Sequence, residues 1–154
     1  MKNYTVKKEN SDDIIVKNIY CIGRNYSEHA KELGNPKPKE PFFFQKSIPS
    51  LNTSQEIVLP EDKSIDYEVE IVLLIGRDGA GKSLEDALSF IDGYAIGIDL
   101  TDREYQNSLK NKKLPWLLSK SFFGSAVVSD FSSRPIEENF WLNINGKRKQ
   151  QGSF

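Results

Sequence analysis

The chain has 154 residues, a length that suits one domain with a single hydrophobic core. Charged residues make up 28% of it and the net charge is −1, so no long-range field favours a nucleic acid or an anionic membrane as partner. No apolar run approaches the ~20 residues that span a bilayer, and the polar start of the sequence does not resemble a secretory signal. Cys21 is the only cysteine, which excludes a disulfide framework, and we expect a cytoplasmic protein.

The first part of the chain predicts short strands around one helix. Residues 13–23 are rich in β-branched side chains, which favour strands. The stretch that follows has a helical period and ends at Gly34, because Pro36 cannot continue a helix. Two further short strands are expected at residues 42–46 and 56–60.

Strands and helices then alternate. Residues 66–76 form the strongest predicted strand, alternating at first and then uniformly apolar, as in a strand whose far end is buried on both faces. A short helix is predicted over residues 83–91, a strand over 93–101 and a polar helix over 102–113. The segment 114–131 is predicted to be irregular and rich in aromatic residues.

The end of the sequence predicts a β-hairpin. Its residues alternate into Asn145-Gly146, the strongest short hairpin signal in the chain. The return strand begins near Lys147 and the sequence stops soon afterwards, so we expect the hairpin to be incomplete.

A nucleotide-binding pattern occurs at residues 76–83, which match G-x-x-x-x-G-K-[ST]. The strand before it carries Glu68 and Glu70 on one face, unlike the buried parallel strand that precedes a phosphate-binding loop. Ser83 with Asp86 three residues later is typical of a helix N-cap, and acidic side chains near this turn would repel a phosphate. A P-loop NTPase is therefore the disfavoured interpretation, and a glycine-rich surface turn the preferred one.

Three carboxylates are the candidates for a metal site. Glu68 and Glu70 lie two apart on one strand, so both side chains point to the same face, and Asp99 lies at the polar end of another strand. Hard oxygen donors without a neighbouring histidine or cysteine suit Mg²⁺ or Mn²⁺. Spacing alone leaves open the alternative that the two glutamates belong to a solvated strand face.

A candidate general base lies on the predicted first helix. His29, the only histidine, and Glu32 are three apart and share a helix face. A carboxylate can orient an imidazole so that it accepts a proton from water. An ordinary charged surface helix is the alternative.

Four further polar side chains are candidates for contacting an anion. Lys120 is a lone cation among apolar neighbours, which is costly unless it meets an anion. Arg24 follows a strand and offers a planar fork for a carboxylate. Arg103 and Gln106 are three apart on one helix just beyond Asp99. Together with the carboxylates, these residues describe a site for a small, oxygen-rich anion on a divalent metal.

Six blocks of the sequence, in order from about residue 18 to the last residue, resemble the fumarylacetoacetate hydrolase family. They are IYCIGRNYSEHAKELG, PFFFQKSIPSL, DYEVEIVLLIGRDG, EDALSFIDGYAIGIDLTDREYQ, LPWLLSKSF and LNINGKRKQ. The likeness is greatest to the short single-domain members of the acylpyruvate hydrolase and oxaloacetate decarboxylase type. The resemblance implies an α+β fold, mostly β: a mixed β-sandwich roll with short helices, incomplete at its C-terminus. It also implies one partial catalytic domain over residues 1–154 and a homodimer.

The resemblance assigns roles to the candidate residues. The family's E-x-E metal pair falls on Glu68 and Glu70 and its third carboxylate on Asp99, which implies Mg²⁺ or Mn²⁺ as cofactor. Its water-activating pair falls on His29 and Glu32.

The remaining roles concern the substrate. The family's lysine falls on Lys120 and would stabilise an enolate or oxyanion, while Arg103 and Gln106 fall near the substrate. The implied reaction is hydrolysis, decarboxylation or tautomerisation of a small 2-keto acid, such as an acylpyruvate, oxaloacetate or a fumarylpyruvate-like compound. The matched blocks omit the family's C-terminal portion, including a T-G-T-P-x-G loop over the substrate. We therefore expect a truncated or split member. A non-catalytic remnant that binds only a metal or a partner chain is the alternative.

Overall fold

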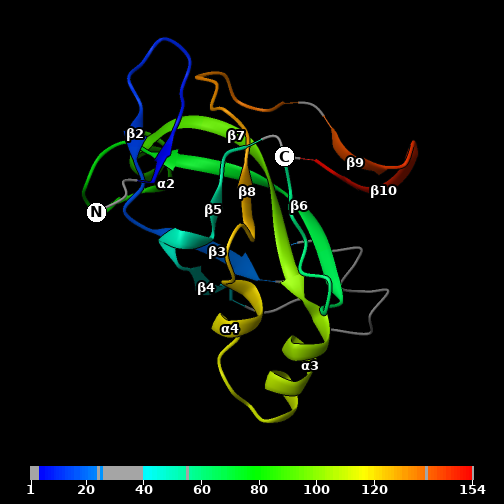
Figure 1. Ribbon diagram of the computed structural model, residues 1–154. Helices are drawn as coiled ribbons and strands as arrows, with labels where there is room; N and C mark the ends of the chain where they lie inside the picture. Colours follow the sequence, from blue (N-terminus) through cyan, green and yellow to red (C-terminus); the bar gives the residue numbers. More distant parts are fainter. Residues whose placement is uncertain (1–3, 24, 26–39, 55, 138, 154) are drawn as a thin grey trace.

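A computed structural model describes residues 4–23, 25, 40–54, 56–137 and 139–153 (Figure 1). Strands predominate and the helices are short, which confirms the predicted α+β class. No helix in these ranges combines the length and apolar character needed to cross a membrane. In chain order the elements are β1 (Thr5–Val6), β2 (Ile14–Ile15), β3 (Ile19–Gly23), β4 (Phe42–Lys46), the 3₁₀ helix η1 (Ile48–Ser50), β5 (Leu51–Asn52), β6 (Ile65–Ile75), α2 (Leu84–Leu88), β7 (Ile91–Asp102), α3 (Arg103–Asn111), α4 (Leu117–Lys120), β8 (Ala126–Val128), β9 (Phe140–Ile144) and β10 (Lys147–Gly152).

A four-stranded sheet in the order β5-β8-β7-β6 forms the centre of the molecule. Its main feature is the long antiparallel pair β6 and β7, which curves across the molecule in Figure 1. The register of this pair runs from Ile65 opposite Asp102 to Ile75 opposite Ile91. β8 is antiparallel to β7 and parallel to β5.

The main apolar cluster lies near the beginning of β7. Val6, Ala95 and Phe131 are each only 3% exposed and pack together. The partly buried side chains around them are Ile14, Val16, Leu51, Val72, Leu74 and Val128. Toward the other end of β7 the buried residues are mostly polar: Asp99, Thr101 and Asp102, with Leu100 among them.

One face of β6 changes character along the strand. Side chains two apart share a face, so Glu68 and Glu70 lie on the same face as Val72 and Leu74, which pack on the apolar cluster. The hydrophobic end of β6 thereby fixes which way its two glutamates point. A slip of one residue in register would turn all of these side chains to the opposite face.

α3 follows β7 directly, and α4 comes next along the chain and lies beside α3 in Figure 1. α3 begins at the N-cap Asp102, whose side chain accepts a hydrogen bond of 3.1 Å from the Tyr105 backbone N–H. This cap satisfies one of the unpaired N–H groups of the first turn. α4 ends at Lys120, which is buried. The two helices therefore carry Arg103, Gln106 and Lys120 to the polar end of β7.

Among the described residues, three antiparallel strand pairs accompany the sheet, and β1 with β2 is the shortest of them. β3 and β4 pair antiparallel, from Ile19 opposite Lys46 to Gly23 opposite Phe42. β9 and β10 turn at Asn145 and Gly146, with φ of 51° and 75°, which confirms the predicted turn.

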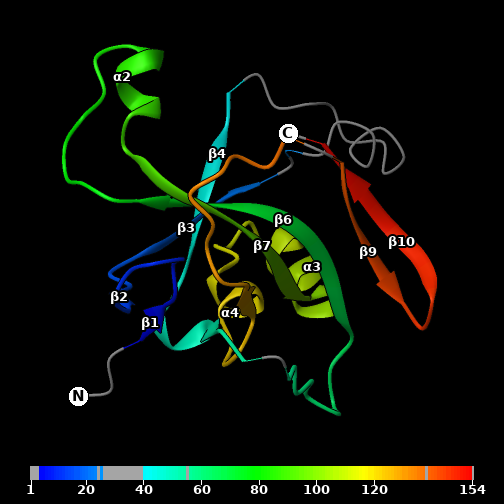
Figure 2. The ribbon, with the colours of Figure 1, turned by 90° about the horizontal axis from the view of Figure 1, so that it is seen from above.

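The C-terminal hairpin is fully paired, and the expectation that it is incomplete is wrong. β10 extends to Gly152, which pairs with Phe140, the first residue of β9. Figure 2 shows the hairpin beside β6. The side-chain amide of Gln150 joins the two: its Oε1 accepts from the Val69 N–H and its Nε2 donates to the Tyr67 carbonyl, both at 2.8 Å.

The strands predicted at 42–46, 66–76 and 93–101 are all present, with ends shifted by at most two residues. Residues 56–60, in contrast, form no strand, and Val58 is 85% exposed. The segment 114–131 is more regular than predicted, because it contains α4 and β8. The helix predicted to end at Gly34 lies outside the described residues.

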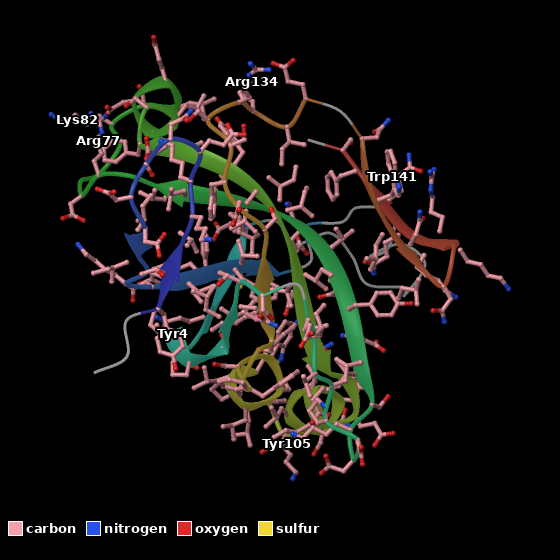
Figure 3. All side chains as sticks on the ribbon, turned by 45° about the horizontal axis from the view of Figure 1, so that its top comes forward. Tyr4, Arg77, Lys82, Tyr105, Arg134 and Trp141 are labelled. Atoms are coloured by element: carbon pink, nitrogen blue, oxygen red, sulfur yellow. The ribbon has the colours of Figure 1, made fainter. Side chains whose placement is uncertain are left out.

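The glycine-rich stretch at residues 76–83 is a surface turn, as predicted. β6, which leads into it, is antiparallel to β7 and not a parallel strand. The Lys82 N–H donates to Asp86 Oδ2 at 3.0 Å, and the Asp86 N–H donates to Ser83 Oγ at 3.1 Å, so the turn caps the short helix α2. In Figure 3, Arg77 and Lys82 lie at the end of the molecule opposite Tyr105 of α3.

Candidate metal and substrate site

The register of β6 and β7 brings two carboxylates together. Glu68 lies directly opposite Asp99, and their side chains are 26% and 10% exposed. Glu70, on the same face, is opposite Gly97. A Cβ at Gly97 would lie 2.7 Å from Val72 Cγ2, so this position has no room for a side chain. Like charges directly opposite one another destabilise a sheet unless a cation offsets them.

Lys120 supplies that cation. Its ammonium lies 2.8 Å from Glu68 Oε2 and also contacts Asp99 Oδ2, while its side chain is only 3% exposed. Burial alone would lower the pKa of Lys120, but the attraction of Asp99 and Glu68 outweighs burial and raises that pKa above its ordinary value. Lys120 therefore remains charged. The sequence predicted that this lysine would meet an anion, and the anion is the carboxylate pair of Glu68 and Asp99.

Lys46 is a second buried lysine at the same place, and sequence reasoning missed it. Its side chain is 2% exposed, and its ammonium lies 2.8 Å from Asp99 Oδ1. The ammonium also donates to the carbonyls of Leu100 at 3.1 Å and Ser125 at 3.0 Å, to Ser125 Oγ at 3.1 Å, and to the Lys120 carbonyl. Burial lowers the pKa of Lys46, and the neighbouring Asp99 opposes that shift.

Arg103 fixes the other side of Glu68. Its Nη2 lies 3.3 Å from Glu68 Oε1, its Nε 2.7 Å from Asp66 Oδ2, and its Nη1 donates to Gln106 Oε1 at 2.6 Å. Gln106 is only 2% exposed. Burial would raise the pKa of Glu68, but Lys120 and Arg103 outweigh it and hold that pKa below its ordinary value. Glu68 is therefore ionised.

Glu70 differs from its two neighbours. Within the described part of the chain its carboxylate has no hydrogen bond or ion pair. Burial, and then repulsion from Asp99 and Glu68, raise its pKa from 4.5 to about 8, and Lys120 only partly opposes them. Glu70 is thus a carboxyl group that no cation in the described structure neutralises.

The chemistry of this donor set fits a divalent cation, because Glu68, Glu70 and Asp99 would offer it hard oxygen ligands. Asp99 Oδ1 is buried and has no hydrogen-bond donor with proper geometry, despite its ion pair with Lys46. In the described ranges, no group of three Asp, Glu, His or Cys side chains is arranged to hold a metal as it stands. The Lys120 ammonium pairs with one oxygen of Glu68 and one of Asp99.

The structure places Glu68, Glu70, Asp99, Lys120, Arg103 and Gln106 in one region, and their proposed roles stay predictions. Arg24, His29 and Glu32 lie outside the described residues, so the predicted water-activating pair stays a prediction. Cys21 faces the same region from β3, and burial, followed by the charge of Asp99, raises its pKa to about 11. Its thiol is therefore neutral and a poor nucleophile.

The fold and the site together describe a mostly β domain in which carboxylates of β6 and β7 pair with the buried ammonium groups of Lys46 and Lys120. The family described as "Fumarylacetoacetate (FAA) hydrolase C-terminal" matches residues 18–154, and the chain belongs to this family.

Two relatives from other organisms are similar to most of the chain. The chain is 37% identical over 143 residues to the mitochondrial oxaloacetate decarboxylase of Dictyostelium discoideum, covering 88% of this chain and 66% of that protein. It is 39% identical over 145 residues to a mitochondrial oxaloacetate tautomerase of Arabidopsis thaliana, covering 87% of this chain and 63% of that protein. The chain thus spans slightly less than two thirds of these relatives. Their mitochondrial names do not fit the expectation of a plain cytoplasmic location.

A solved structure with the same fold was crystallised with a metal. The fumarylpyruvate hydrolase of Pseudomonas aeruginosa, in complex with Mn²⁺ and pyruvate, superposes with a TM-score of 0.88 at 30% identity. The match covers 97% of this chain and 70% of that one.

Proposed function

We propose that this chain belongs to an enzyme that cleaves or rearranges small 2-keto acids with the help of Mg²⁺ or Mn²⁺. The observation that carries the proposal is the pairing of Glu68 and Asp99 with the buried ammonium of Lys120, beside Glu70 on the same face of β6. Oxaloacetate and acylpyruvates are the substrates to test first, because the named relatives act on oxaloacetate or fumarylpyruvate.

Glu68, Glu70 and Asp99 would hold the metal. When bound, a divalent metal supplies Lewis-acid chemistry to a carbonyl oxygen. The protein's own part is to present three hard oxygen ligands and to withdraw the Lys120 ammonium from two of them. The Mn²⁺ in the Pseudomonas relative supports a divalent ion at such a site.

Lys120, once released from the carboxylates, would stabilise negative charge that develops on the substrate oxygen. A preorganised cation in a site shielded from water is effective at this task. Gln106 and Arg103 would contact the substrate from α3, with Arg103 also holding Glu68 in place. Arg24 is proposed as a further ligand of the substrate carboxylate.

The proposed proton transfer belongs to His29. Oriented by Glu32, its imidazole would take a proton from water for hydrolysis, or hand a proton to the substrate for decarboxylation or tautomerisation.

The test combines turnover with metal binding. Oxaloacetate and acetylpyruvate are incubated with the chain and Mn²⁺ or Mg²⁺, and Mn²⁺ binding is measured separately by electron paramagnetic resonance. Wild type should bind Mn²⁺ and turn over at least one substrate, and Glu70→Ala should lose both. Glu85→Ala is the matched control: it also removes a glutamate, but from the exposed helix α2, and it should lose neither metal binding nor turnover. Absence of metal-dependent turnover in the wild type would refute the catalytic proposal for this chain.

The second candidate is a non-catalytic protein that binds only a metal or a partner chain. It predicts Mn²⁺ binding that Glu70→Ala removes, without turnover of either substrate. We also propose a homodimer, which light scattering during size-exclusion chromatography would detect as twice the chain mass.

A further inference from the structure

Lys46 connects more elements at the site than any other side chain described above. The lysine lies at the end of β4, and its ammonium contacts β7 through Asp99 and Leu100, the end of α4 through the Lys120 carbonyl, and the residue before β8 through Ser125. All of these segments are distant from Lys46 in the sequence. One ammonium therefore joins four parts of the fold at the candidate metal site.

The arrangement gives Lys46 more acceptors than it has protons. Three N–H groups face an Asp99 oxygen, three main-chain carbonyls and the Ser125 hydroxyl. Burying an ammonium is costly unless it is paired and hydrogen-bonded, and these contacts compensate it. The Asp99 carboxylate is held at Oδ1 by Lys46, while its Oδ2 contacts the Lys120 ammonium.

Lys46 also acts on Lys120 indirectly. It binds the main-chain carbonyl of Lys120, while the Lys120 side chain reaches the same Asp99 carboxylate. Ser125 Oγ donates to that carbonyl as well, at 2.8 Å. The position of the Lys120 backbone and the orientation of Asp99 thus depend on one buried group.

We propose that Lys46 is a positioning residue of the candidate site, which orients Asp99 for the metal and fixes the backbone that carries Lys120. The inference rests on the proposed metal site and adds a residue that would not touch substrate or metal. Lys46 could instead act only as a positive charge. The two roles predict opposite changes in metal affinity when Lys46 is removed. A mere charge repels the metal, so its removal should tighten metal binding, whereas removal of a positioning residue should weaken it.

Mn²⁺ affinity therefore decides between the roles. Lys46→Met should weaken Mn²⁺ binding by about tenfold or more, the range typical of outer partners of metal ligands. Lys8→Met is the matched control: it removes another lysine–aspartate pair, with Asp92 at 2.7 Å, that shares no contact with the site. It should leave the affinity unchanged. Unchanged or tighter Mn²⁺ binding by Lys46→Met would overturn the proposal.

Ser125→Ala provides a second test in case Lys46→Met does not fold. It removes one acceptor of the ammonium and the donor to the Lys120 carbonyl while every charge remains. Positioning predicts Mn²⁺ binding weakened several-fold, and a folded Ser125→Ala with wild-type affinity would contradict it. Failure of the proposed function is separate: it appears as a wild type that binds no Mn²⁺, and it overturns this inference too. A different result would overturn the Lys46 role alone. In that case the wild type binds Mn²⁺ and Glu70→Ala abolishes this binding, but Lys46→Met and Ser125→Ala both leave it intact.

Discussion

Glu68 and Asp99 face each other across the β6–β7 ladder, and only the Lys120 ammonium lies between their carboxylates in the described structure. Two opposed carboxylates are unfavourable in a sheet, so the pair depends on a cation. In the described structure that cation is part of the protein itself. The proposed divalent ion would compete with this lysine for the same carboxylate oxygens.

Replacing Lys120 with methionine should reveal this competition. The metal-free variant should be less stable, because removing one partner of a buried ion pair costs about 3–5 kcal/mol. Mn²⁺ should bind it more tightly than wild type and raise its melting temperature by a larger amount, since no ammonium must be displaced. Thermal unfolding with and without Mn²⁺ measures both effects. Equal metal-induced shifts in the variant and the wild type would contradict competition.

The stability of the metal-free chain should depend on pH through Glu70. Its pKa is about 8 in the folded state and 4.5 ordinarily, so the folded chain holds a proton that the unfolded chain releases. Stability should therefore fall as pH rises from about 5 to about 8. Mn²⁺ affinity should rise over the same range, because the proton must leave before the metal binds. Melting curves at several pH values for wild type and Glu70→Gln provide the comparison, and an identical pH slope in the two proteins would disprove the assignment to Glu70.

Gln150 should stabilise the strand that carries the glutamates. Its amide bonds the Val69 N–H and the Tyr67 carbonyl, which flank Glu68. Gln150→Ala leaves two backbone groups without these partners and should cost about 1–3 kcal/mol. Denaturant unfolding measures the loss, and hydrogen exchange at the Val69 amide should accelerate. Gln151→Ala is the control: that side chain is exposed, and its one side-chain hydrogen bond among the described residues comes from Arg148, so equal effects of the two changes would contradict the anchoring role.

The glycine-rich turn should bind no nucleotide. Lys82→Ala should leave Mn²⁺ affinity and melting temperature unchanged, because only its backbone N–H takes part in the cap of α2. Asp86→Ala, which removes the acceptor of that N–H, should lower the melting temperature slightly. Calorimetric titration of the chain with MgATP tests whether the turn binds a nucleotide. Saturable binding that Lys82→Ala abolishes would restore the P-loop interpretation.

The sequence predicted the long elements because their signals are local. The alternation in residues 66–76, the N-cap at Ser83 and the Asn145-Gly146 turn each contain the information within a few residues. Residues 56–60 carry the same β-branched signal but find no neighbouring strand, and pairing is decided by tertiary structure. β8 was missed for the opposite reason: its three residues are strand because β7 and β5 lie on either side.

The same distinction applies to the site. A spacing of two predicts that Glu68 and Glu70 share a strand face, but their role as metal ligands, like that of Asp99, was an implication of the family resemblance. Lys46 could not be assigned to the site, because its acceptors come from β7, α4 and the segment before β8. One signal was present: Phe42, Phe44 and Lys46 alternate along β4, which places a lysine on an otherwise aromatic face.

The contact between Gln150 and β6 has a consequence for solubility. An exposed edge strand offers unpaired N–H and C=O groups to other chains and is a common starting point of aggregation. β6 is long and largely apolar toward its far end, where Leu73 and Ile75 are 41% and 59% exposed. By occupying the Val69 N–H and the Tyr67 carbonyl, a single side chain interrupts the continuous row of hydrogen-bonding groups that a foreign strand would need to add itself to this edge.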